Sequence, residues 1–148
     1  NTANWRCVPD DQAIGDGDMV LEVIPATSAT STSIFYSSPM PVVTGQTVEL
    51  SVYANGYYPA LNPNTSDVEL RALWFVDALT LYPTTTAADT IVASVTNITE
   101  IEGAPMRSLS GTATVPGGGT AFVRLGLRSV VADAAGVHYD FATVRVIS

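Results

Sequence analysis

The sequence predicts an all-β protein, a sandwich or barrel of about eight antiparallel strands. Short apolar segments recur along the chain, and clusters of Gly, Pro, Asn, Asp and Ser separate them at intervals of roughly 8–14 residues. No stretch shows the sustained 3.6-residue repeat of an amphipathic helix. The 148 residues fit one domain, so we expect residues 1–148 to form a single unit. Because the sequence starts at Asn1 and not at Met, we expect a processed or excised part of a longer chain.

The first two predicted strands lie near the start of the chain. Met19 to Ile24 is short, apolar and β-branched, and it follows a turn-like run of Gly and Asp. Ser31 to Ser37 carries Ile, Phe and Tyr among Ser and Thr. Pro39 and Pro41 come next, and because proline donates no ladder hydrogen bond, they indicate a sheet edge or a connection.

The two strands predicted in the middle of the chain show clear alternation. In Thr47 to Ala54, Val and Leu occupy every second position against Thr, Glu, Ser and Tyr, which indicates a half-buried strand. Val68 to Asp77 also alternates, but both of its faces become apolar near Trp74 and Phe75. We therefore expect this end of the strand to be covered on both sides, with Trp74 in the core.

The second half continues the pattern after one ambiguous stretch. Leu79 to Ile101 is rich in Thr and Ala, and a short helical turn near Ala87 to Ala93 is one reading of it. Three further segments then read as strands: Arg107 to Val115, Thr120 to Val130 and Val137 to Ile147. Pro116 to Gly119 forms a hairpin-like loop between the first two.

Charge and composition exclude several classes of partner. The formal net charge is −8, from 14 Asp and Glu against six Arg and no Lys. Nucleic acids and anionic membranes both attract clustered positive charge, so we expect neither as a partner. Hydrophobic residues make up 47% of the chain, yet no apolar run approaches the ~20 residues of a membrane helix.

Residues suited to catalysis are scarce. The chain has one histidine, His138, and one cysteine, Cys7, whereas a nucleophile needs a base within hydrogen-bond reach. No G-x-S-x-G elbow, P-loop or G-x-G-x-x-G motif occurs. We interpret Cys7 as a small buried hydrophobe, and His138 with Asp140, on one strand face, as a surface pair or a capped strand end. The chain is therefore predicted not to be an enzyme.

Tyrosines in the predicted loops suggest a binding surface. Tyr57 and Tyr58 lie in the loop Asn55 to Ser66, and Tyr82 lies in the ambiguous stretch. Sugars stack their C–H faces on aromatic rings beside polar groups. These three tyrosines are the candidate ligand-binding residues. The alternative is that they pack a loop onto the sandwich or contact a neighbouring subunit.

Five segments in sequence order resemble carbohydrate-binding-module jelly rolls of the galactose-binding-like type. They are Val43 to Ala54, Glu69 to Val76, Ser110 to Pro116, Thr120 to Arg128 and Val137 to Val146. The last one resembles the closing Y-x-D-D-V-x-V strand of that family, and the ordered set covers about residues 41–148. The resemblance implies a jelly-roll β-sandwich that binds glycans without catalysing a reaction.

The resemblance also implies a structural calcium. In the family, the first aspartate of the closing motif often helps to hold this ion, and Asp140 stands at that position. The second aspartate is replaced by Phe141, and the acidic ligand of the family's opening segment is not recognisable before Trp5. Asp140 is thus the candidate metal ligand, and calcium is the only cofactor that the sequence suggests.

Modules of this kind occur in polysaccharide-degrading enzymes and in tail and surface proteins of bacteriophages, and the lysine-free, Ala/Thr/Val-rich composition suits the second setting. The first hypothesis is a glycan-binding module on a phage virion, extracellular, that recognises a cell-surface polysaccharide. The alternative is a structural or decorating virion protein, a homo-oligomer or multi-copy assembly, that uses the jelly roll for protein–protein contacts. Both stay open at this point, because fold alone does not determine function.

Overall fold

The computed structural model describes residues 3–9, 19–25, 31–57, 66–79, 89–98, 106–131 and 136–148. These ranges contain ten β-strands: β1 (Ala3–Pro9), β2 (Met19–Pro25), β3 (Ser31–Tyr36), β4 (Met40–Pro41), β5 (Thr47–Tyr57), β6 (Ser66–Phe75), β7 (Thr90–Ile98), β8 (Arg107–Thr114), β9 (Phe122–Val131) and β10 (Gly136–Val146). In the same ranges, no helix has the length and apolar character needed to cross a membrane.

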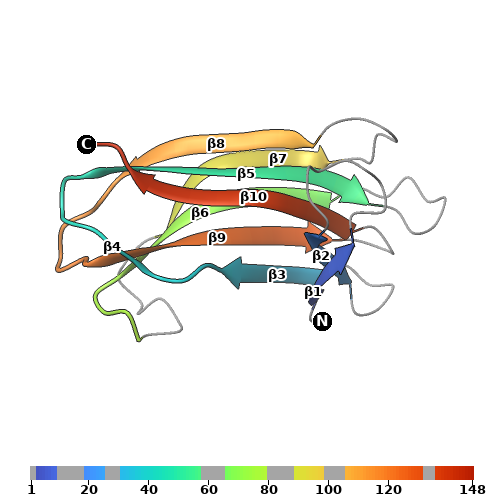
Figure 1. Ribbon diagram of the computed structural model, residues 1–148, viewed down its shortest axis with the longest axis horizontal. Helices are drawn as coiled ribbons and strands as arrows, with labels where there is room; N and C mark the ends of the chain where they lie inside the picture. Colours follow the sequence, from blue (N-terminus) through green and yellow to red (C-terminus); the bar gives the residue numbers. More distant parts are fainter. Residues whose placement is uncertain are drawn as a thin grey trace.

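The strands form two antiparallel sheets. Sheet A has the order β1-β2-β10-β5-β8, and sheet B has the order β3-β9-β6-β7, with β4 paired to β9. The chain changes sheet between β2 and β3, at both steps from β4 to β6, and at each step from β7 to β10, which is the connectivity of a jelly roll. Figure 1 shows the strands running along the long axis, with the two termini at opposite ends. The predicted fold class is confirmed.

The described residues form ten strands, whereas about eight were predicted, because edge strands show weak hydrophobic alternation. β1 pairs with β2 alone, and β4 has only two residues. The helical turn suggested near residues 87–93 is wrong for the described part of that stretch, because Thr90 to Ala93 belong to β7. β-Branched residues favour a strand there, and β7 is an edge strand with two register shifts against β6, so its pattern is irregular.

The core lies between the two sheets. The inner face of β5 contributes Val48, Leu50, Val52 and Ala54, and the inner face of β6 contributes Val68, Leu70, Ala72 and Trp74. Trp74 is buried as predicted, and its Nε1 donates a hydrogen bond to Thr90 Oγ1 at 3.1 Å. The hydroxyls of Tyr139 in sheet A and Ser129 in sheet B share a buried hydrogen bond of 2.5 Å.

The outer face of sheet B is covered at the end of β6. Leu73 and Phe75 point away from the core, yet both are buried, which confirms the expected two-sided burial. The guanidinium of Arg124 lies 5.4 Å from the centre of the Phe75 ring. It also donates hydrogen bonds of 3.0 Å to the carbonyl oxygens of Ser37 and Ala78. Arg124 therefore fixes two segments, one at Ser37 and one at Ala78, to sheet B.

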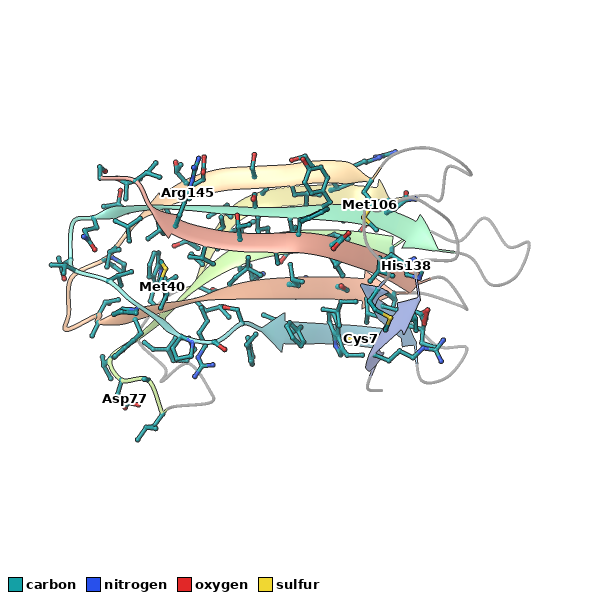
Figure 2. The ribbon with its side chains drawn as sticks, in the orientation of Figure 1. Cys7, Met40, Asp77, Met106, His138 and Arg145 are labelled. Carbon is teal, nitrogen blue, oxygen red and sulfur yellow. The ribbon has the colours of Figure 1, made fainter. Side chains whose placement is uncertain are left out.

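Cys7 is exposed, so its interpretation as a buried hydrophobe is wrong. It lies on β1, the outermost strand of sheet A, directly opposite Leu21 of β2. An edge strand has a neighbour on one side only, and its side chains are covered less completely. Figure 2 shows Cys7 at the end of the sandwich where β1 lies.

Candidate functional site

The outer face of sheet A gathers most of the polar and exposed aromatic side chains of that sheet. Side chains alternate along a strand, so the residues between the core positions of β5 and β10 all point outward. They are Glu49, Ser51, Tyr53 and Asn55 on β5, and His138, Asp140, Thr143 and Arg145 on β10. We call this surface the outer face of sheet A. Figure 2 shows Arg145 and His138 at opposite ends of β10, so the outer face of sheet A extends along this strand.

A buried polar row crosses one end of this face. Glu22, His138 and Asn55 are cross-strand neighbours on β2, β10 and β5, and they are only 2%, 1% and 2% exposed. Arg6 of β1 donates from Nε to Glu22 Oε2 at 2.8 Å, and its Nη2 lies 2.7 Å from the same oxygen. The row spans four strands, and Arg6 compensates the charge of the buried Glu22 carboxylate, which would be costly without a cation beside it.

His138 is buried and lies beside Glu22, so its predicted surface position is wrong. His138 Nε2 lies 3.4 Å from Glu22 Oε1, and both side chains are buried. Directly opposed side chains on neighbouring strands are closer together than residues i and i+2 of one strand. Only the register of β2 against β10, which the sequence does not state, brings Glu22 to this place.

Two exposed aromatic rings meet in the middle of the face. The centroids of Tyr53 and Phe141 lie 5.9 Å apart, with the rings at 73°, an edge-to-face contact. Tyr53 is 42% exposed and Phe141 is 47% exposed. Two large apolar rings thus remain in solvent on a surface that otherwise carries polar side chains.

Phe141 reaches this position through an irregularity of the backbone. The register of β10 against β5 shifts between Asp140 and Thr143, and Phe141 has a φ of 49°. Regular alternation would turn Phe141 to the opposite face from Asp140, whereas a bulge re-aims the side chain. A left-handed φ at a non-glycine residue costs about 1–2 kcal/mol.

Asp140 lies on β10 between His138 of the polar row and Phe141 of the aromatic pair, opposite Tyr53. Its Oδ1 accepts a hydrogen bond from the Phe141 amide at 2.8 Å, which supports the bulge. Its Oδ2 is buried and has no hydrogen-bond partner. Among the described residues, no three His, Cys, Asp or Glu side chains gather as a metal site would require. Calcium binding by Asp140 stays a prediction.

Hydroxyls and one ion pair surround the rings. Ser51 Oγ and Thr143 Oγ1 share a hydrogen bond of 2.7 Å, and Ser108 and Ser110 of β8 lie opposite Tyr53 and Ser51. Arg145 Nε donates a hydrogen bond to Glu49 Oε2, and this bond raises the pKa of the arginine above its ordinary value. The face therefore offers apolar ring surface beside groups that both donate and accept hydrogen bonds.

The side chains of the three tyrosines predicted as ligand contacts lie outside the part of the chain that the structure describes. Tyr57 is the last residue of β5 and pairs with Gly136, so it stands in a strand and not in a loop, but its side chain lies outside the described part. Tyr58 and Tyr82 lie outside the described residues. All three stay predictions.

The sequence contained one usable signal for the aromatic pair. Tyr53 is an aromatic residue on the polar side of the alternating segment Thr47 to Ala54, and an aromatic side chain on a solvent face indicates contact with something else. Phe141 carried no such signal, because its orientation depends on the bulge.

No protein-family model matches the chain, and no curated protein matches it in sequence. Its fold is nevertheless similar to solved structures of carbohydrate-binding modules. The CBM22-1 xylan-binding domain of Paenibacillus barcinonensis Xyn10C matches with a TM-score of 0.61 and 12% identity, over 99% of this chain and 82% of that one. The CBM22-1-GH10 modules of Clostridium thermocellum xylanase 10B, complexed with xylohexaose, match with a TM-score of 0.58 and 14% identity.

A phage protein shares the fold as well. The enzymatically active domain of bacteriophage CBA120 tailspike protein 4 matches with a TM-score of 0.58 and 13% identity over 99% of this chain. The chain spans 25% of the xylanase chain and 18% of the tailspike chain. At these identities the similarity establishes the jelly-roll fold.

Proposed function

We propose that this protein is a non-catalytic glycan-binding module and that the outer face of sheet A is its binding surface. The exposed pair Tyr53–Phe141 carries the proposal, because its geometry is maintained at the expense of a strained backbone at Phe141. A pyranose ring presents an apolar C–H face and a rim of hydroxyls. The two aromatic rings fit the apolar C–H face of the sugar. Ser51, Thr143 and Asp140 supply hydrogen-bonding groups for its hydroxyls.

The structural comparisons support this reading. Two solved structures of similar fold are linked to glycans. One is a xylan-binding domain, and the other is a set of modules complexed with xylohexaose. The similarity to a phage tailspike and the lysine-free composition favour an extracellular setting on a virion surface. We propose a cell-surface polysaccharide as the ligand.

The test is a glycan array followed by affinity electrophoresis with the wild-type protein and two variants, Tyr53→Ala and Phe141→Ala. Each truncation removes one ring, and we expect each to weaken binding about tenfold or more, which corresponds to about 1.4 kcal/mol. Tyr36→Ala is the matched control, since Tyr36 points outward from sheet B, and we expect it to leave the affinity unchanged.

Two outcomes contradict the proposal. If both ring variants bind as well as the wild type while substitution of Tyr57, Tyr58 or Tyr82 abolishes binding, the site lies elsewhere, at the tyrosines named from the sequence. If no glycan is bound and light scattering shows a defined oligomer, the result favours a structural virion protein that uses the jelly roll for contacts between proteins.

A further inference from the structure

Apart from its single histidine, the chain carries six basic side chains, and all of them are arginines. Every one of these arginines lies in the described ranges. A glycan that carries carboxylate, sulfate or phosphate groups is held by guanidinium groups, which match these anions in a bidentate geometry. The state of the six arginines therefore indicates which charge class of glycan the protein accepts.

Two arginines point outward from sheet A, Arg145 on the outer face and Arg6 beside it on β1, and both are already paired. Arg6 binds the buried Glu22, and Arg145 binds Glu49. A ligand anion that took Arg6 would leave the Glu22 carboxylate, whose side chain is only 3% exposed, without its cation. Asp140 adds a third carboxylate to the same face, with no arginine of its own.

Three of the remaining arginines point away from this face, on sheet B. Arg71 and Arg128 share Glu69, at 2.5 Å and 3.2 Å, and Arg71 also contacts Asp89. Arg124 donates to two backbone carbonyls. The sixth, Arg107, is the first residue of β8 and shares a register position with Ala54, which faces the core, so it lies outside the row of outward side chains.

We infer that the outer face of sheet A accepts uncharged glycans and excludes acidic ones. This inference rests on the proposed function and narrows its ligand class. The exposed hydroxyls of the face bond to sugar hydroxyls in either direction, whereas its arginines are neutralised by neighbouring carboxylates. The net charge of −8 adds a long-range repulsion toward polyanions at low salt.

The experiment uses polymers that differ in charge but share a backbone. Hydroxyethylcellulose is compared with carboxymethylcellulose, and fully methyl-esterified polygalacturonate with polygalacturonate, by affinity electrophoresis at low and high ionic strength, together with neutral and acidic members of a glycan array. We expect binding only to neutral glycans, with little dependence on salt. Tighter binding to an acidic member, weakened by salt, overturns this inference and leaves the proposed function intact. Binding to no glycan of either class overturns both.

One substitution tests the physical cause. Glu49→Gln removes the carboxylate that neutralises Arg145, and because the pair lies at the surface, we expect the fold to be kept. The variant should gain at least threefold in affinity for acidic polymers at low salt, and Arg145→Gln in the same background should remove that gain. An unchanged affinity of Glu49→Gln for acidic polymers overturns the assignment.

Glu69→Gln is the matched control. It changes the net charge by the same amount but frees arginines on sheet B. We expect no gain in acidic-polymer binding from it. An equal gain in both variants would show that net charge alone, and not the Glu49–Arg145 pair, excludes acidic glycans.

Discussion

The Cα of Gly111 in β8 packs against the backbone carbonyl of Val92 in β7. A Cβ placed on Gly111 would overlap the Val92 oxygen and would come within 3.2 Å of the Val92 Cβ. β8 is an edge of sheet A and β7 is an edge of sheet B. The absence of a side chain at Gly111 therefore allows the two sheets to close on each other along this side.

We expect Gly111→Ala to destabilise the protein by about 1–3 kcal/mol, because the added methyl group meets backbone that cannot move independently of its sheet. Urea denaturation followed by tryptophan fluorescence measures the effect. Gly117→Ala is the control, since a Cβ there has no atom within 4 Å. Equal midpoints for the two variants would show that β7 and β8 are not in close contact.

The left-handed backbone at Phe141 predicts that glycine is more stable than alanine at this position, the reverse of their order in a regular strand. Glycine adopts a left-handed φ without cost, and alanine does not. We expect Phe141→Gly to be about 1 kcal/mol more stable than Phe141→Ala, while both variants bind glycans about tenfold or more weakly than the wild type. At Ser110, in the regular strand β8, we expect alanine to be the more stable of the two. The same order at both positions would contradict a left-handed backbone at Phe141.

Tyr139 predicts a loss of stability in alkaline solution. Burial raises the pKa of its phenol, and the hydrogen bond with Ser129 lowers it only in part. In the unfolded chain the phenol ionises near pH 10, whereas in the folded protein it stays protonated. Its contribution is therefore complete below about pH 10, and above it falls by up to about 1.4 kcal/mol per pH unit.

The check is urea denaturation of the wild type and Tyr139→Phe between pH 7 and pH 11. At pH 7 we expect the variant to be about 1–3 kcal/mol less stable, because Ser129 loses its buried partner. Above pH 10 this difference should shrink. Tyr53→Phe, at an exposed tyrosine, should show no such change. A constant difference for Tyr139→Phe across the pH range would be evidence against a buried phenol.

Arg124 is expected to be the arginine that matters most for folding. Arg124→Met keeps the length of the side chain but removes two hydrogen bonds to the carbonyls of Ser37 and Ala78. We expect a loss of about 2–4 kcal/mol in the free energy of unfolding, measured by thermal and urea denaturation. Arg107→Met, at an exposed residue, should leave the midpoint unchanged. An Arg124→Met protein as stable as the wild type would exclude this role.

Regular alternation made much of the fold predictable. Val48, Leu50 and Val52 alternate with polar residues in the sequence, and all three are buried on the inner face of β5. The doubly apolar end of β6 indicated cover on both faces, and Leu73 and Phe75 are buried on the outer one. Such patterns are local, so each strand carries its own evidence for which side faces the core.

The sequence by itself thus determined the all-β class, the central strands and the scarcity of catalytic residues. Only the tertiary structure decided the site. The alignment of Glu22, His138 and Asn55 depends on the register of three strands, two of them far apart in sequence. The meeting of Tyr53 with Phe141 depends on a bulge that reverses the direction of one side chain. Register and bulges are properties of strand pairs, and a single strand's alternation contains no information about its partner.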